Sequence, residues 1–190
     1  MKQTKVISAF PACGKTYYFD NRPDDIIVLD SDSSNFSWHE RIRTEEELEI
    51  ERKRWDSKPH LLDSRFYINK IKDEVIRKRN PEFPQNYIEY IKNNIGKVDY
   101  IFVSTHKEIR DALDDAGIEY TLVFPKKDLK AEWVGRCFLR GSDIKFCDLI
   151  ATNWDNWIYE MEEECILKNR KSYRLEHGEY LSDALNFIIS

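Results

Sequence analysis

The chain has 190 residues, of which 41% are hydrophobic, 13% aromatic and 34% charged. This composition predicts one soluble globular domain and excludes a chain that is disordered throughout. The formal net charge of −5 disfavours general electrostatic adhesion to DNA or membranes, although local basic clusters can still bind phosphate groups.

The cysteines and the apolar segments indicate the compartment. The four cysteines lack the spacing of a zinc site and are expected to be reduced thiols. No apolar run approaches the length of a membrane-spanning helix, and the N-terminal residues pass directly into a strand-like run without a signal peptide. We therefore expect a cytoplasmic protein without a membrane partner.

The first predicted element is a short apolar strand that runs into the sequence Ala9-Phe10-Pro11-Ala12-Cys13-Gly14-Lys15-Thr16. This sequence fits the phosphate-binding pattern G-x-x-x-x-G-K-[ST], except that Ala9 stands at the first glycine position. In that pattern, backbone N–H groups surround the phosphates, the lysine reaches the β- and γ-phosphate oxygens, and the hydroxyl binds Mg²⁺. The pattern predicts binding of ATP and Mg²⁺, and a tight turn that binds nothing is the alternative. The residues expected to contact ATP are Ala9, Pro11, Ala12, Cys13, Gly14, Lys15, Thr16 and Tyr17.

A second predicted strand, residues 26–29, ends in the polar run Asp30-Ser31-Asp32-Ser33-Ser34. Polar residues at the carboxyl end of a strand lie where open α/β sheets bind their ligands. Asp30 and Asp32 are candidates to hold Mg²⁺ together with Thr16, or to accept a proton from an attacking hydroxyl. Ser33 is a candidate to bind the substrate. A solvated Asx turn that caps the strand is the structural alternative.

Residues 37–95 are highly charged and favour helices, which predicts a helical insertion. Its clearest helical pieces are residues 45–52 and 68–79, and prolines separate the helices. Arg65 contributes to a basic face of this insertion, and Phe83 or Tyr87 is a candidate to stack on a base. Helices of mixed charge that only present a solvated face are the alternative.

Two further strands, residues 100–103 and 120–124, flank a predicted helix at residues 107–116 and complete a βαβ unit. The first of these strands ends in Ser104-Thr105-His106, where many P-loop proteins place an acidic residue. His106 is a candidate to contact a nucleotide phosphate, and capping of the following helix is the alternative.

Helices are predicted at residues 128–139 and 142–167, followed by a fifth strand at 171–175 and a last helix from Ser182. Arg136 and Arg140 lie four residues apart, so both guanidinium groups are expected on one helix face. Planar, bidentate donors on a movable segment suit a transferring phosphoryl group, and an ordinary surface pair is the alternative. The alternation of strands and helices predicts an α/β fold with a parallel sheet that helices cover on both faces.

Together these motifs resemble the P-loop kinases of the nucleotide-kinase superfamily, and most closely the nucleoside monophosphate kinase-like proteins of bacteriophages and prophages. The resemblance rests on residues 9–16, 28–36, 80–87, 102–106 and 178–183 and on the segment with Arg136 and Arg140. It implies a single P-loop NTPase domain over residues 1–190, with a three-layer fold and a five-stranded parallel sheet. It also implies an acceptor-binding helical insertion at 37–95, an arginine-bearing lid at 126–145 and, for a phage-encoded protein, action in the host cytoplasm.

The expected function is ATP- and Mg²⁺-dependent phosphoryl transfer to a nucleotide, in the first place a (deoxy)nucleoside monophosphate. The residues expected to be catalytic are Lys15, Asp30, Asp32, Arg136 and Arg140, and those expected to hold the metal are Thr16, Asp30 and Asp32. The residues expected to bind the acceptor are Ser33, Arg65, Phe83, Tyr87 and His106.

Two alternatives stay open. Polynucleotide-kinase-type enzymes place an aspartate after the second strand as a general base, and Asp30 or Asp32 would take this role toward a hydroxyl. The acceptor would then be a nucleoside, a polynucleotide 5′ end or a modified base in DNA, although the net charge does not favour DNA. The missing acid after the third strand would instead suit a non-enzymatic ATP-binding regulatory protein. No oligomeric state is predicted.

Overall fold

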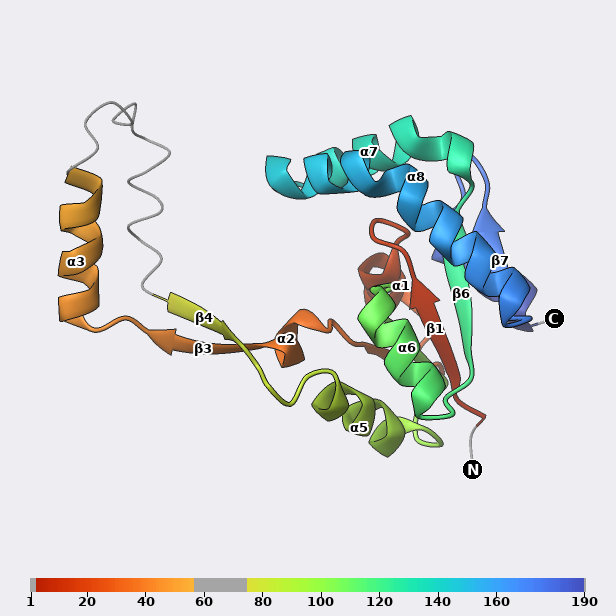
Figure 1. The fold of residues 1–190 in the computed structure, drawn as a ribbon. Helices are drawn as coiled ribbons and strands as arrows, with labels where there is room; N and C mark the ends of the chain where they lie inside the picture. The colour runs from red at the N-terminus through yellow and green to blue at the C-terminus, as the bar shows by residue number, and fades with distance from the viewer. Residues whose placement is uncertain (1–2, 57–74, 190) are drawn as a thin grey trace. The chain divides into compact units, whose positions relative to one another are not determined.

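The computed structural model describes residues 3–56 and 75–189 (Figure 1). The chain forms two compact units, of which the larger comprises Met1–Ser33 and Pro84–Ser190, and the smaller comprises Ser34–Phe83. Arg65, a candidate to bind the acceptor, lies outside the described residues.

A five-stranded sheet forms the centre of the larger unit, and every pair of neighbouring strands in it is parallel. Its strand order is β2-β5-β1-β6-β7. The strands are β1 (Lys5–Ala9), β2 (Val28–Asp30), β5 (Tyr100–Val103), β6 (Tyr120–Pro125) and β7 (Ser172–Leu175). The prediction of an α/β fold with a five-stranded parallel sheet is confirmed.

The central strands consist of nearly continuous apolar residues because the sheet is buried on both faces. Every residue of β5 is buried, and so are all residues of β6 except Thr121. In the middle strand, Ile7 pairs with Phe102 of β5 on one side and with Thr121 of β6 on the other. This burial on both faces is consistent with a three-layer α/β arrangement.

Six α-helices of the larger unit follow or connect these strands: α1 (Lys15–Asn21), α5 (Gln85–Asn94), α6 (Lys107–Asp115), α7 (Lys130–Leu139), α8 (Ile144–Leu167) and α9 (Leu181–Ile189). A 3₁₀ turn, η2 (Lys127–Leu129), precedes α7. Figure 1 shows α8 as the long blue helix beside β6. Among residues 3–56 and 75–189, no helix has both the length and the apolarity needed to cross a membrane.

The longest helix, α8, follows directly from the sequence. The Asp143 side chain caps its N-terminus by accepting a hydrogen bond from the backbone N–H of Phe146 at 2.8 Å. Its buried positions recur at intervals of three or four residues and form one apolar stripe: Cys147, Ile150, Trp154, Ile158, Met161 and Cys165. Trp154 is fully buried and packs edge-on against Phe10, with 5.7 Å between the ring centroids. Trp154 is therefore part of the core.

The described part of the smaller unit contains α2 (Ser34–Ser37), β3 (Trp38–Ile42), α3 (Glu45–Asp56) and β4 (Val75–Arg79). The prediction of a helix at residues 45–52 is confirmed by α3. Thr44 and Glu47 form a capping box at its start, in which the Glu47 N–H donates to the Thr44 hydroxyl at 3.3 Å. The Thr44 N–H donates in return to the Glu47 carboxylate at 3.0 Å.

The prediction of a helix over residues 68–79 is wrong at residues 75–79, which form β4, while residues 68–74 lie outside the described residues. Strand β4 pairs antiparallel with β3, so that Trp38 lies opposite Arg79 and Glu40 opposite Arg77. The Arg77 Nε donates to the Glu40 carboxylate at 2.7 Å. A strand partner and a cross-strand ion pair favour the extended backbone here, whereas helix propensity is only a weak local preference.

Candidate functional site

The strand order of the sheet reverses at β1, because β5 and β2 lie on one side of it and β6 and β7 on the other. Ligands of open parallel sheets bind outside the carboxyl ends of the strands at such a point. Residues 10–14, which we call the β1–α1 loop, leave β1 there and lead into α1. The residues expected to bind ATP therefore lie at the preferred ligand position of this fold.

The β1–α1 loop has an unusual backbone conformation. Ala12 has a φ of 60° and Gly14, which precedes the first residue of α1, has a φ of 93°. A left-handed backbone conformation with positive φ raises the free energy of an alanine by roughly 1–2 kcal/mol, whereas glycine adopts it at almost no cost. Strained residues of this kind occur where the surrounding structure holds a loop in one functional shape.

Carbonyl groups of the loop and its flanks accept hydrogen bonds from the surrounding structure. The acceptors are Ala9, Phe10, Pro11, Cys13 and Gly14. The Lys15 Nζ donates to the first two at 2.6 and 3.3 Å, the Trp133 Nε1 donates to Pro11 at 2.9 Å, and the Leu181 N–H donates to Cys13 at 2.8 Å. Because the C=O and N–H of a peptide unit point in opposite directions, the contacts of the Pro11 and Cys13 carbonyls leave the N–H groups of Ala12 and Gly14 facing away from Trp133 and Leu181. Backbone N–H groups of nearby residues that face the same way form an anion-binding concavity.

The side chain of Cys13 is fixed inside the protein, with 1% of the residue exposed. Burial raises the pKa of its thiol, and the nearby Lys15 ammonium opposes this shift. The thiol is therefore protonated at neutral pH, and Cys13 offers a ligand its backbone. Tyr17, in contrast, is 73% exposed on α1.

Thr16 and Asp30 form a direct contact between α1 and β2. The Thr16 hydroxyl donates a hydrogen bond to the Asp30 carboxylate across 3.0 Å. A hydroxyl and a carboxylate are oxygen ligands, which suit Mg²⁺. In the described ranges 3–56 and 75–189, no group of three or more His, Cys, Asp or Glu side chains could hold a metal ion. The pair therefore fits an Mg²⁺ that takes most of its ligands from water and phosphate, and does not form an all-protein cage.

Asp32 occupies a different position, two residues beyond the end of β2, and it is exposed. Its negative charge acts to raise the pKa of the His106 imidazole and of the Tyr87 phenol. Protein packed around His106 lowers the pKa of the imidazole, and the Asp32 carboxylate opposes this shift. The His106 side chain makes no capping hydrogen bond to α6, so its ring is not used as a helix cap.

Polar residues that follow β2 and β5 hold each other. The hydroxyl oxygens of Ser33 and Ser104 lie 3.0 Å apart, and the Ser8 hydroxyl donates to the Ser104 carbonyl at 3.1 Å. Ser33 is buried in this contact. The structure thus brings Ser33 to the same carboxyl edge of the sheet as Thr16 and Asp30.

Tyr87 does not suit its predicted role in stacking on a base. It is fully buried, and its hydroxyl donates to the Ser31 carbonyl at 2.9 Å. Burial raises the pKa of Tyr87, and the hydrogen bond to Ser31 opposes this shift. An aromatic residue on the inner face of α5 is core, and its helical position could have indicated this. Phe83 belongs to the smaller unit, where the Arg79 guanidinium lies over its ring at 4.5 Å.

Arg136 and Arg140 do not share one environment. The Arg136 side chain is 10% exposed, and its Nη1 donates to the Glu179 carbonyl at 2.8 Å. Arg140 is exposed beyond the end of α7 at Leu139, and its Nε donates to the Ser142 hydroxyl at 2.8 Å. Arg136 is therefore enclosed, whereas Arg140, which follows the last residue of α7, is open to solvent.

No protein-family model, curated protein or solved structure matches the chain.

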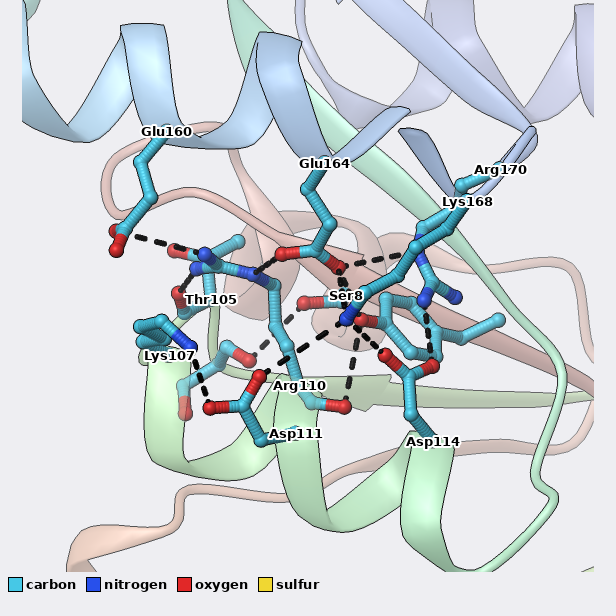
Figure 2. A network of polar contacts seen from close by, with 12 residues as sticks. Ser8, Thr105, Lys107, Arg110, Asp111, Asp114, Glu160, Glu164, Lys168 and Arg170 are labelled. Atoms are coloured by element: carbon cyan, nitrogen blue, oxygen red, sulfur yellow. Dashed lines mark hydrogen bonds and ion pairs between the residues drawn. The ribbon is translucent and has the colours of Figure 1, made fainter. Parts of the chain in front are cut away.

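A buried polar network holds the segment that follows β5. Figure 2 shows Arg110 of α6 pointing toward Glu164 of α8, while Arg170 approaches the same carboxylate from the other side. The Arg110 Nε donates to Glu164 at 2.7 Å, and the Arg170 Nε donates to it at 3.1 Å. Arg110 also donates from Nη1 to the Thr105 carbonyl, next to His106. The network therefore fixes the backbone beside His106 to the helical layer.

Three residues were missed in the sequence analysis: Trp133 and Tyr180, which contact the β1–α1 loop, and Glu132, which binds Arg136 beside them. A signal for one of them was present, because Glu132 and Arg136 have the i, i+4 spacing of a helical ion pair. The contacts of Trp133 and Tyr180 with the loop join distant parts of the chain, and local spacing does not indicate them.

Proposed function

We propose that the protein is an ATP- and Mg²⁺-dependent phosphotransferase and that its acceptor is a nucleotide, in the first place a (deoxy)nucleoside monophosphate. One observation carries this proposal. The Thr16 hydroxyl and the Asp30 carboxylate meet at 3.0 Å at the start of α1, directly after a loop with left-handed Ala12 and Gly14. This is the arrangement of groups that a P-loop kinase needs around a bound triphosphate.

Each group of the site has a role in this proposal. Backbone N–H groups of the β1–α1 loop bind the β- and γ-phosphates. Lys15 leaves the carbonyls of Ala9 and Phe10 and neutralises charge on the transferring phosphoryl group. Thr16 and Asp30 hold Mg²⁺, whose chemistry is to neutralise and orient the phosphate oxygens.

The acceptor side of the site contains the polar residues that follow β2 and β5. Ser104 and His106 offer hydrogen-bonding groups there, the buried Ser33 holds Ser104, and Arg140 is the exposed arginine that follows α7. A nucleoside monophosphate is already ionised, so transfer to it needs no general base. The acceptor phosphate oxygen attacks the γ-phosphorus, the bond to the β–γ bridging oxygen breaks, and ADP leaves.

A second candidate function, transfer to a hydroxyl, is favoured by the position of Asp32. Since Asp30 is paired with Thr16, Asp32 is a separate carboxylate whose charge acts on His106. In this reaction the hydroxyl oxygen attacks the γ-phosphorus, its proton moves to Asp32, and ADP leaves. The acceptor would be a nucleoside, a polynucleotide 5′ end or a modified base in DNA.

Transfer of labelled γ-phosphate from ATP tests the proposal. The acceptors are the ribo- and deoxynucleoside monophosphates, the nucleosides, and DNA oligomers with a 5′-hydroxyl or a hydroxymethylated base. Label on a monophosphate supports the nucleotide kinase, and label on a nucleoside or on DNA supports the hydroxyl kinase. ATP binding without labelled product for any acceptor would overturn both and support a regulatory ATP-binding protein.

A further inference from the structure

The side chain of Arg136 lies between two aromatic rings. Its guanidinium carbon is 4.0 Å from the centroid of the Trp133 ring and 4.1 Å from the centroid of the Tyr180 ring. Cation–π contacts of this kind become stronger when the cation is desolvated, and the Arg136 side chain is only 10% exposed. The guanidinium therefore joins α7, which carries Trp133, to the segment that precedes α9, which carries Tyr180.

Hydrogen bonds strengthen the same connection. Arg136 donates from Nη1 to the Glu179 carbonyl at 2.8 Å and from Nη2 to the Glu132 carboxylate. Glu132 also accepts from the Gly178 N–H at 3.1 Å and contacts the His177 Nδ1 at 2.7 Å. Burial opposes ionisation of Glu132, but these donors together lower the pKa of its carboxyl. Residues 177–180 are thus held to α7 by a charged cluster.

This cluster reaches the β1–α1 loop at three points. The Trp133 Nε1 donates to the Pro11 carbonyl at 2.9 Å, and the Leu181 N–H donates to the Cys13 carbonyl at 2.8 Å. The Tyr180 ring covers Gly14 so closely that its Cδ1 is 3.3 Å from the position a Cβ on Gly14 would occupy. The residues on both sides of Arg136 therefore pack directly against the strained loop.

We propose that Arg136 is a positioning residue that holds the β1–α1 loop in its phosphate-binding shape, acting through Trp133 and Tyr180 without touching a phosphate. The part that concerns ATP rests on the proposed function. Arginine is required because only a planar guanidinium stacks between two rings while donating in two directions. A lysine keeps the charge but loses the stacking and the second directed hydrogen bond.

Two measurements on Arg136→Lys test this inference. The first is amide hydrogen exchange of Leu181, whose N–H is bound to the loop. We expect exchange to be about tenfold faster than in the parent protein, which corresponds to the loss of one charge-assisted interaction. Arg140→Ala, which removes a neighbouring exposed arginine, is expected to leave this exchange unchanged. Parental exchange at Leu181 in Arg136→Lys would overturn the proposal.

The second measurement is steady-state kinetics. Arg136→Lys is expected to raise KM for ATP about tenfold and to leave KM for the acceptor unchanged, since the loop binds only ATP. A loss of kcat at constant KM for ATP would instead indicate that Arg136 contacts the transferring phosphoryl group, and it would overturn the proposal. If the parent protein binds no ATP, the proposed function fails, and Leu181 exchange alone decides whether Arg136 holds the loop.

Variants of Tyr180 provide an independent test that leaves Arg136 in place. Tyr180→Ala removes the ring that lies on both Gly14 and Arg136, and we expect it to accelerate Leu181 exchange as Arg136→Lys does. Tyr180→Phe keeps the ring and is expected to behave like the parent protein. Equal exchange in the alanine and phenylalanine variants would contradict the inferred contact path.

Discussion

The Thr16 hydroxyl donates a hydrogen bond to the Asp30 carboxylate at 3.0 Å, which joins the first turn of α1 to the end of β2. This contact separates two aspartates that the sequence left equivalent. Asp30 contacts the hydroxyl that would bind Mg²⁺, whereas the charge of Asp32 acts on the pKa of His106. The two carboxylates are therefore expected to respond differently to mutation.

Removal of the Thr16 hydroxyl is expected to change the metal dependence of the reaction. In Thr16→Val, the concentration of Mg²⁺ needed for half-maximal transfer should rise about tenfold or more, because one oxygen ligand is lost. Initial rates over a series of Mg²⁺ concentrations measure this shift. Thr16→Ser keeps the hydroxyl and serves as the control. An unchanged Mg²⁺ requirement in the valine variant would exclude Thr16 as a ligand.

Removal of the Lys15 ammonium is expected to lower the rate of transfer by about 100-fold or more, because a cation at the γ-phosphate stabilises charge in the transition state. The structure supplies no buried ion pair that would unfold the variant, since the Lys15 Nζ contacts only the carbonyls of Ala9 and Phe10 in the described residues. Label transfer and thermal unfolding are measured together. Lys145→Ala, at an exposed position of α8, is the matched control. Full turnover in Lys15→Ala would disprove the proposed mechanism.

Asp32→Asn distinguishes the two candidate reactions. If the acceptor is a monophosphate, the rate of transfer should change by less than about tenfold, because no proton has to be removed. If the acceptor is a hydroxyl, the rate should fall by about 100-fold or more while ATP affinity stays the same. Rates and ATP affinity are measured with the acceptor identified by label transfer. A large rate loss with a monophosphate acceptor would contradict the first assignment.

The conformation of Gly14 predicts a local cost for any side chain. Gly14→Ala should lower the free energy of unfolding by about 1 kcal/mol or more and weaken ATP binding, because φ is 93° and the new Cβ would meet Tyr180 at 3.3 Å. Gly135→Ala is the control, since Gly135 lies inside α7 and a Cβ added there would meet no atom within 4 Å. That variant should be more stable by roughly 0.5–1 kcal/mol. Urea unfolding measures both, and equal stability of the two variants would contradict the geometry.

The network around Glu164 predicts how stability depends on pH. Burial opposes ionisation of Glu164 and Asp114, but their cationic partners lower the pKa of each below the ordinary values of 4.5 and 3.8. Groups with a lowered pKa contribute stability that is complete above the ordinary value and is lost as the pH falls through the folded value. The free energy of unfolding should therefore decrease from about pH 5 downward. Urea unfolding at successive pH values measures this decrease.

Glu164→Gln is the variant that isolates this contribution. It should unfold more easily at neutral pH, by about 3–5 kcal/mol, because the Arg110 guanidinium is 3% exposed and would keep its charge without this partner. Its stability should also depend less on pH below pH 5 than that of the parent protein. Glu163→Gln, at the exposed neighbouring position, should retain the parental profile. A parental profile in Glu164→Gln would show that the acid sensitivity arises elsewhere.

The sequence alone was sufficient for the elements whose pattern is local. The strands of the central sheet were predictable because apolar, β-favouring runs such as residues 100–103 are buried on both faces. The pattern over residues 142–167 predicted α8, and the pattern from Ala9 to Thr16 indicated the loop at the switch point of the sheet. In each case residues close together in the sequence contain the pattern that predicts the element, either as a periodic arrangement of apolar residues or as a fixed spacing of a motif.

Only the tertiary structure decided the contacts between distant segments. Residues 75–79 form a strand because β3 supplies a partner 33 or more positions earlier in the chain. Asp30 differs from Asp32 because one of them reaches Thr16, and Arg136 is enclosed because Tyr180 returns to it from the segment before α9. The physical reason is that burial, ion pairing and stacking depend on which surfaces come into contact in the folded protein. The helix and strand propensities of neighbouring residues contain no information about these tertiary contacts.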